Sequence, residues 1–213
     1  NHKEENMNIF FNLYMKLDHS ECNVANGKRL FAYIIDWFLG SLCTLLPMCL
    51  LWMMWTKDME TMAGVNVLVI AGRLGDGKAY LAGTLSILFA LFYYVYIPLK
   101  IYPGQTPGKR AMGFKIVKKD DSKADLKTLL IREVIGVMII EGSLYTVSGV
   151  WHSMLSLALN LNLVGILMYA GLAVGILSGF MILKINSRRM FHDYLAKTKV
   201  VEYEEYMGEN KSI

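Results

Sequence analysis

The feature that most constrains this chain is an apolar run of 26 residues, Leu30–Trp55, interrupted by one carboxylate, Asp36. A helix needs roughly 20 apolar residues to cross the hydrocarbon of a bilayer. At a rise of about 1.5 Å per residue, Asp36 lies roughly 9 Å beyond Leu30, inside the hydrocarbon. An unpaired charge near the bilayer centre costs roughly 2.5–3.5 kcal/mol, so such residues usually face protein. The run therefore predicts a membrane span, beginning at Arg29, whose Asp36 meets another part of the chain.

Composition and three further apolar segments indicate the same class. Of the 213 residues, 54% are hydrophobic and 19% are charged, and most charges lie between the apolar runs. The sequence predicts an all-α integral membrane protein with four transmembrane helices. The expected spans are about 29–55, 79–99, 126–147 and 163–185. Because the basic residues flank these spans, we do not expect nucleic-acid binding.

The distribution of Lys and Arg predicts the orientation. The segments 1–29, 100–128 and 184–213 contain four, eight and six of these residues, whereas 56–78 contains three and 142–162 contains none. Cytoplasmic loops usually carry the excess of positive charge. Four spans with both termini in the cytoplasm place the three most basic segments on that side.

The segments outside the spans carry weaker patterns. Residues 1–28 are amphipathic and fit either an interfacial helix or a disordered segment with some local helix. Met62–Ala71 is too short to span and is expected to be extended or interfacial. Phe114–Lys119 and Thr198–Tyr203 alternate as strands do and predict a small cytoplasmic β element, followed by a polar tail, 203–213.

No sequence pattern predicts an enzyme or a cofactor. The segment Gly104–Arg110 (GQTPGKR) superficially resembles a phosphate-binding loop, but three residues rather than four separate its glycines, and Arg110 follows Lys109 where Ser or Thr is required. The three cysteines lack CxxC spacing, so we expect no metal site.

Further candidates for function are the charged residues of the third apolar segment, one histidine of the tail and three glycines of the fourth segment. Arg132 and Glu133 lie near the start of the third span, and Glu141 is expected near mid-membrane. Glu141 fits either a neutral, hydrogen-bonded carboxyl group or a proton relay. His192 either titrates near physiological pH or is a hydrogen-bonded tail residue. Glycines spaced by four predict a close helix approach and a possible oligomer seam; they are Gly171, Gly175 and Gly179.

Four motifs, in order over about residues 25–202, resemble the RDD family of small bacterial membrane proteins. They are Arg29 with Asp36, the loop GQTPGKRAMGFKIV (Gly104–Val117), LIRE (Leu130–Glu133) and RMFHDYLAKTKVV (Arg189–Val201). The family is named for one Arg and two Asp, which on this sequence would be Arg29, Asp36 and Asp193. Two positions depart from the usual pattern of the family. One is Pro107. The other is Ala196-Lys197-Thr198, where the family more often has Ala-Gly-Thr, so that a tight turn at this point becomes doubtful.

The resemblance implies a multi-pass protein of the bacterial inner membrane and leaves two functions open. For some members the resemblance implies an exchange of cations for protons. In this chain such an exchange would use Asp36 and Glu141 within a homo-oligomer to move Na⁺, Li⁺ or K⁺. Others look like accessory subunits, which would present the basic loop 100–128 to a partner membrane protein or to anionic lipid. The charged trio is accordingly either a coupling site or an ion-paired clasp. The loop residues that the resemblance marks are Gly104, Gln105, Thr106, Gly108, Lys109 and Arg110.

Overall fold

The computed structural model describes residues 22–204 and 206, without the side chain of Ser143. The predicted N-terminal segment therefore lies mostly outside the described residues, as does most of the polar tail. The helices are α2 (Asn26–Thr56), η1 (Met62–Gly64), α3 (Val67–Leu74), α4 (Asp76–Leu91), η2 (Phe92–Ile101), α5 (Pro107–Ala111), α6 (Leu126–Leu129), η3 (Leu130–Glu141), η4 (Gly142–Leu144), α7 (Thr146–Leu159), α8 (Val164–Lys184) and α9 (Phe191–Leu195). The strands are β1 (Phe114–Lys118) and β2 (Thr198–Glu202).

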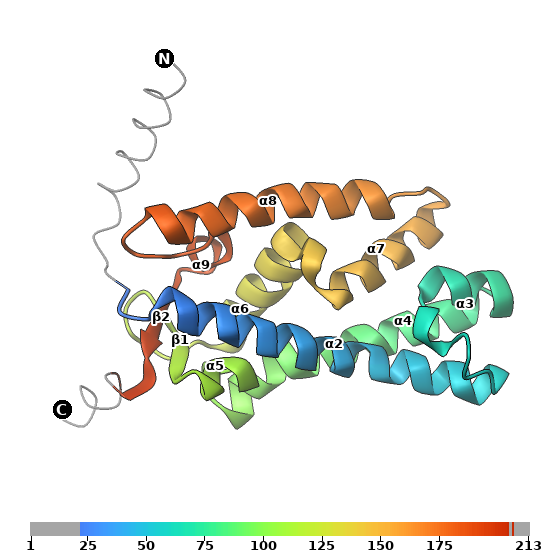
Figure 1. Ribbon diagram of the computed structural model, residues 1–213, viewed down its shortest axis with the longest axis horizontal. Coiled ribbons are helices and arrows are strands. Elements are labelled where there is room, and N and C mark those ends of the chain that lie inside the picture. Colours follow the sequence, from blue (N-terminus) through green and yellow to red (C-terminus); the bar gives the residue numbers. More distant parts are fainter. Residues whose placement is uncertain (1–21, 205, 207–213) are drawn as a thin grey trace, which may run out of the picture.

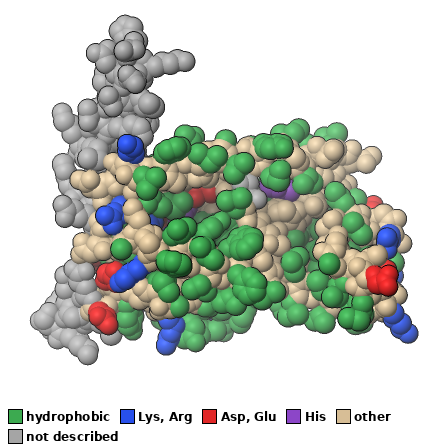
Figure 2. All heavy atoms as spheres, viewed as in Figure 1, with side chains coloured by type: hydrophobic (Ala, Val, Ile, Leu, Met, Phe, Trp, Pro, Cys, Tyr) green, Lys and Arg blue, Asp and Glu red, His purple; other side chains and the backbone are tan. Residues whose placement is uncertain are grey.

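The helices form an elongated bundle (Figure 1). One end of it carries α5, α9 and both strands, and we call this the capped end; α3 lies at the opposite end. Hydrophobic side chains cover much of the middle of the face seen in Figure 2, and charged side chains gather towards the two ends. In water such an apolar surface would be unusually large, whereas a bilayer matches it.

Among the described residues, three helices are long and apolar enough to cross a membrane: α2, Asp76–Ile101 (α4 with η2), and α8. Leu126–Glu141 and Thr146–Leu159 make a fourth span if the two are taken together, with a bend of 67° between them. The chain is therefore a multi-pass membrane protein with three or four spans. α2 and α8 closely match the first and fourth expected spans.

The third expected span, 126–147, instead breaks after Glu141. A Cβ on Gly142 would collide with the Ser148 hydroxyl and the Val137 carbonyl, so glycine permits this tight turn. The carbonyl of Met138 accepts hydrogen bonds from Ser148 Oγ (2.8 Å) and from the Trp151 indole (3.0 Å). Side chains of α7 thus satisfy backbone groups near the break. The uncharged segment 142–162, which we expected to be an external loop, contains α7.

A second difference concerns Met62–Ala71, which we expected to be extended or interfacial. Most of its second half belongs to α3, which begins after Asn66, whose side chain accepts a hydrogen bond from Val69 N–H. This N-cap satisfies a donor that the first helical turn leaves unpaired. Val67 and Ile70 are fully buried beside Trp52 of α2 and Ala82 of α4. The β-branched residues that favour a strand here pack as a short helix against the bundle.

The small β element is confirmed. β1 and β2 pair antiparallel, with Phe114 opposite Glu202 and Lys118 opposite Thr198. The tight turn before β2, which the segment Ala196-Lys197-Thr198 made doubtful, is present. Lys197 takes the left-handed conformation (φ 55°) in which glycine is more common. Phe114, Ile116 and Val200 pack together with α2 residue Ala32. The sheet therefore rests on the capped end of α2.

Candidate functional site

Asp36 is 3% exposed and receives donors from two distant segments. Its Oδ1 accepts hydrogen bonds from the Tyr93 hydroxyl (2.9 Å) and from Gly108 N–H (2.8 Å). Its Oδ2 accepts one from the Thr106 hydroxyl and lies 3.5 Å from Lys109 Nζ. We call these five residues the Asp36 cluster. Three neutral donors and one ammonium group thus compensate the burial of one carboxylate.

The local sequence of the loop brings its donors to α2. Pro107 occupies the first turn of α5, where its missing N–H costs nothing and its fixed φ suits a helix. A Cβ on Gly108 would overlap the Ala32 carbonyl and lie 2.8 Å from the Asp36 carboxylate, so glycine lets this backbone N–H approach. The Pro107 departure from the family pattern therefore fits the helix that carries Gly108.

The remaining loop residues hold the loop in place. Gln105 donates from Nε2 to the Phe114 carbonyl of β1 (2.9 Å). Gly104 has φ 78°, and its carbonyl accepts from Ile116 N–H at 2.8 Å. The Arg110 guanidinium lies 4.0 Å from the centre of the Tyr102 ring, as in cation–π pairs.

A second buried carboxylate, Asp193, lies in α9 and is 1% exposed. Its Oδ1 accepts from Arg132 Nε (3.1 Å) and from the Thr198 hydroxyl (2.9 Å). Its Oδ2 lies 3.7 Å from Arg29 Nη2 and accepts from Met190 N–H at 3.2 Å. Burial opposes the ionisation of Asp193, but its basic neighbours, Arg132 first and then His192 and Arg29, outweigh it and hold the pKa of this carboxyl well below its usual range.

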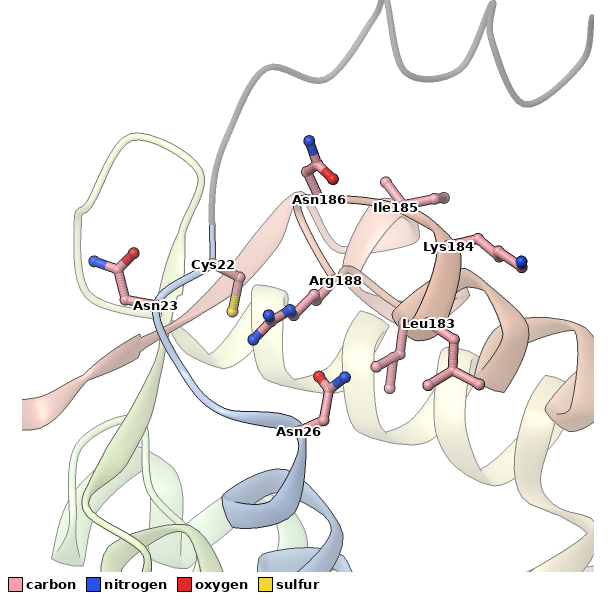
Figure 3. Close-up of a pocket in the computed structure, with 9 residues that line it drawn as sticks. Cys22, Asn23, Asn26, Leu183, Lys184, Ile185, Asn186 and Arg188 are labelled. Carbon is pink, nitrogen blue, oxygen red and sulfur yellow. The ribbon is translucent and has the colours of Figure 1, made fainter.

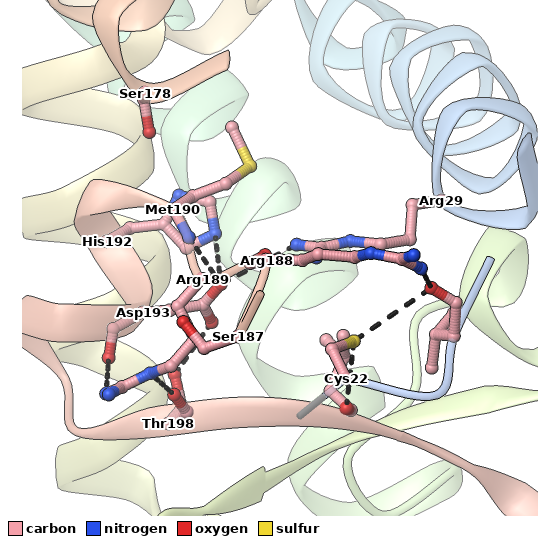
Figure 4. A network of polar contacts seen from close by, with 12 residues as sticks. Cys22, Arg29, Ser178, Ser187, Arg188, Arg189, Met190, His192, Asp193 and Thr198 are labelled. Carbon is pink, nitrogen blue, oxygen red and sulfur yellow. Dashed lines mark hydrogen bonds and ion pairs between the residues drawn. The ribbon is translucent and has the colours of Figure 1, made fainter. Parts of the chain in front are cut away.

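His192 extends this network to Glu141. Figure 4 shows His192 together with Asp193, Arg29 and Ser178. His192 Nδ1 lies 2.8 Å from Glu141 Oε2, and His192 Nε2 lies 3.0 Å from Arg132 Nη2. Glu141 Oε1 also accepts from His192 N–H and from the Ser178 hydroxyl, both at 2.9 Å. Arg132 additionally pairs with Glu133. We call the group Arg29, Arg132, Glu133, Glu141, His192 and Asp193 the α9 cluster.

The predicted trio is therefore divided between two clusters. Arg29 pairs with Asp193, whereas Asp36, two turns further along α2, belongs to the other cluster. Glu141 contacts α8 near the capped end. Its partner Ser178 lies six residues before the end of α8, or about 9 Å at 1.5 Å per residue. Asp36 and Glu141 thus both lie towards the capped end.

Residues that the sequence did not single out complete both clusters. Tyr94 donates to the Asp36 carbonyl (2.9 Å), and its ring fills the space that a Cβ on Gly40 would occupy. A Cβ on Gly136 would lie 2.5 Å from His192 Cβ, so Gly136 permits α9 to approach η3. Isolated glycines inside apolar helices were the available signal, because they often mark a close packing contact.

The glycine face of α8 is directed mainly into the chain. Gly171 is buried, and a Cβ on Gly175 would lie 3.3 Å from the Glu141 carbonyl oxygen. A Cβ on Gly179 would meet nothing within 4 Å. The close approach predicted from these glycines therefore occurs at Gly175 against the end of η3.

A cavity of about 480 Å³ adjoins the break in the third span. Its wall includes Leu144, Tyr145 and Thr146, which follow the break, and the buried His152 of α7. Across the cavity lies Asn66, the N-cap of α3. Within the described residues, no group of three or more His, Cys, Asp or Glu side chains is placed to hold a metal ion.

Comparison with known proteins identifies the family. The model of the RDD family matches residues 25–197, which include every charged residue of the two clusters. No curated protein and no solved structure matches the chain. The resemblance deduced from the four motifs is confirmed: the chain belongs to the RDD family.

Proposed function

We propose that the protein is a non-enzymatic transporter that exchanges Na⁺, Li⁺ or K⁺ for protons, with the Glu141–His192 pair carrying the proton. The observation behind this proposal is that a buried carboxylate and an imidazole are hydrogen-bonded at 2.8 Å where the third span breaks. Intramembrane acids and histidines commonly mark proton paths. In this proposal the capped end and both termini face the cytoplasm of a bacterial inner membrane, as the Lys and Arg distribution favours.

The contacts of His192 make it sensitive to a proton. With Nδ1–H donating to Glu141, the neutral ring leaves Nε2 to accept from Arg132 Nη2. A second proton on Nε2 would face an N–H of Arg132. Protonation would therefore displace Arg132, with Asp193 Oδ2 at 3.7 Å from Nε2 as the alternative acceptor, or pass a proton from Nδ1 to Glu141. Histidine is the side chain whose charge changes most readily between about pH 5 and 8.

The surrounding fold supports a transport path. Transporters often place their sites at discontinuous helices, where backbone groups and helix ends can face an ion. Here η3 ends at Glu141, and α7 begins at Thr146 beside the cavity of about 480 Å³. Three or four spans are few for alternating access, so the proposal includes a homo-oligomer.

In this proposal Asp36 has a structural role. Both of its oxygens accept hydrogen bonds, and three of its donors belong to the loop that it anchors. Taking up a proton on Asp36 would weaken these bonds and loosen the loop. We therefore assign the coupling step to Glu141 and His192 and the attachment of the loop to Asp36.

Proton flux in proteoliposomes tests this proposal. A pH dye trapped inside would report the collapse of a preset pH gradient when Na⁺, K⁺ or Li⁺ is added outside. We expect cation-dependent flux in the wild type and its loss in Glu141→Gln and His192→Gln, with both variants inserted and folded. Thr44→Ala is a matched control because Thr44 lies on α2 outside both clusters and outside the lining of the cavity, and donates locally to Gly40 O. Unchanged flux in Glu141→Gln would contradict the proposal.

A second candidate is an accessory subunit that presents the basic loop to an acidic partner protein. It is favoured by the firm attachment of residues 104–118 to α2 through Asp36, while Lys119, Lys123 and Lys127 of the same loop remain exposed. The triple change of these lysines to Glu should release a partner that co-purifies with the wild type. If the purified protein shows no cation-dependent flux and this change releases a partner, the second candidate replaces the first.

A further inference from the structure

A polar pocket of about 430 Å³ lies at the capped end, between the residues that precede α2 and the end of α8 (Figure 3). It is separate from both carboxylate clusters. Its polar wall comes from Asn23, Asn26, Lys184, Asn186 and Arg188. Leu183, which is 68% exposed on the apolar surface of α8, forms part of the remaining wall. The pocket therefore lies where an apolar span gives way to polar chain.

Arg188 is held at this pocket in an unfavourable backbone conformation. Its φ is 47°, in the left-handed region that non-glycine residues rarely adopt. Arg29 donates to its carbonyl, and Arg188 Nη1 donates to the Val24 carbonyl at 2.9 Å. A guanidinium has five N–H donors. Among the described residues, the Val24 carbonyl is the one acceptor bonded to the Arg188 guanidinium. Strained residues of this kind often occur at binding sites.

The charges around the pocket are unbalanced. Arg188 and Lys184 line it, and Arg29 lies directly behind Arg188. The nearest buried carboxylate, Asp193, is shared by Arg29 and Arg132. On the outer side, Glu202 already pairs with Lys28 at 2.8 Å. Among the described residues, neither Lys184 nor Arg188 has a carboxylate partner, so the described wall of the pocket is positively charged and favours an anion.

The start of α2 adds donors on the same side. Asn26 is the first residue of this 31-residue helix, which has no acidic residue in its first turn and no side-chain cap. The first N–H groups of a helix lack partners within it, and the helix dipole favours an anion there. These groups support the cationic side chains.

We propose that this pocket binds the phosphate group of an anionic membrane lipid, with Arg188 as its direct cationic contact and Lys184, which extends away from Arg188 in Figure 3, as a cation at its rim. A phosphate offers Arg188 several acceptor oxygens, and the lipid tails would lie along the exposed apolar surface of α8 near Leu183. Basic pockets between membrane helices on the cytoplasmic side are a known way to bind anionic head groups. This proposal does not depend on ion exchange.

Lipid binding to the purified full chain tests the proposal. The protein in neutral detergent would be titrated with phosphatidylglycerol, and the shift of its thermal unfolding midpoint would be measured. Phosphatidylcholine and inorganic phosphate would be titrated in parallel. We expect stabilisation by phosphatidylglycerol, and about fivefold weaker binding in each of Lys184→Gln and Arg188→Gln, as one basic contact is worth. Lys127→Gln is the matched control, because it removes one exposed charge from the 100–128 loop.

The outcomes separate the possibilities. Equal weakening in Lys127→Gln and Lys184→Gln would mean general attraction to anionic lipid and would overturn the proposal. Stabilisation by inorganic phosphate, with none by phosphatidylglycerol, would overturn the lipid as the source of the phosphate. Arg188→Gln removes the bond to Val24 and leaves a non-glycine residue at φ 47°. Arg188→Gly also lacks that bond but relieves the backbone strain, so this protein should fold and should bind phosphatidylglycerol about fivefold more weakly. A full response in Arg188→Gly would contradict the assignment.

Discussion

The Asp36 cluster and the α9 cluster both bury a carboxylate at the capped end, but they do so with different partners. Asp36 is met mainly by neutral donors, namely two hydroxyl groups and a backbone N–H, with Lys109 at 3.5 Å. Asp193 is met by the guanidinium groups of Arg29 and Arg132. The first cluster attaches the loop that precedes β1, and the second attaches α9, which precedes β2.

The difference indicates which cluster can respond to a proton. Neutral hydroxyl and amide donors keep their hydrogen-bonding roles across the physiological pH range. In the α9 cluster, His192 lies between an acceptor, Glu141, and a donor, Arg132, so an added proton changes one of these two contacts. The two buried aspartates therefore have different assigned roles: Asp36 attaches the loop, and in the proposed function the cluster around Asp193 attaches α9 and also responds to a proton.

The largest expected effect comes from removing Asp193. Asp193→Ala leaves Arg29 and Arg132 without the carboxylate that they share, and breaking a buried ion pair costs about 3–5 kcal/mol. We expect a large fall in the thermal unfolding midpoint in detergent, or failure to accumulate folded protein in the membrane. Asp36→Ala should cost less, because most of the groups that it leaves are neutral. Equal losses for the two variants would remove the distinction between the clusters.

Asp36→Asn tests the attachment of the loop alone. The amide keeps one acceptor but places its NH₂ group against a donor, and a hydrogen bond to a charged acceptor is worth about 1.5–3 kcal/mol. We expect faster trypsin cleavage after Lys109 or Arg110, followed by mass spectrometry of the fragments. Cleavage after Lys197, beside α9, should keep its wild-type rate. Faster cleavage at both places would show that the clusters are coupled.

Gly136→Ala tests the approach of α9 to η3. The new methyl group would lie 2.5 Å from His192 Cβ, so α9 must shift, and overpacking of this kind typically costs about 1–3 kcal/mol. The matched control is Gly179→Ala on α8, where a methyl group meets nothing within 4 Å. Thermal unfolding of both variants in detergent measures the difference. A Gly136→Ala protein as stable as Gly179→Ala would show that α9 is not seated as described.

The smallest effect is expected from mild acid acting on Asp193. Its pKa is lowered in the folded protein, so its contribution is full above about pH 4, the ordinary range of an unfolded aspartate, and is lost as pH falls from there through the lowered value. In a His192→Gln background, which removes the pH response of α9, the difference in unfolding midpoint between Asp193 and Asp193→Asn should therefore stay constant from pH 8 to pH 5. A difference that already shrinks near pH 6 would mean that Asp193 is not held ionised by its arginines.

Much of the fold could be predicted from the sequence because run length and alternation are local properties. The length of Leu30–Trp55 requires a span, and the alternation around Ile116 and Val200 predicts the two strands. The break after Glu141 was missed because hydropathy runs on through Gly142, and the turn depends on contacts with Ser148 and Val137 that are formed only in the folded chain. Short length and β-branched residues also favoured an extended or interfacial Met62–Ala71, whereas packing against α4 makes α3 helical.

The sequence predicted which residues belong to the candidate site but not which of them contact one another. A charge in an apolar run requires a partner, which singled out Asp36 and Glu141, but the run does not say which of several distant cations or hydroxyl groups that partner is. The seven-residue spacing of Arg29 and Asp36 suggested one group, and the structure assigns them to different clusters. Tyr93 gives no signal of its own in the sequence, and Gly136 signals a close contact without naming its partner, because both roles depend on contacts across the bundle.

The most direct test of the division between the clusters is hydrogen exchange of the purified protein at several pH values between 8 and 5, corrected for the intrinsic pH dependence of amide exchange. The account predicts that protection of residues 191–195 falls as the pH is lowered, while protection of residues 107–111 stays constant. It also predicts that His192→Gln abolishes the pH response of α9. An equal response in both segments, or none in α9 of the wild type, would contradict the account.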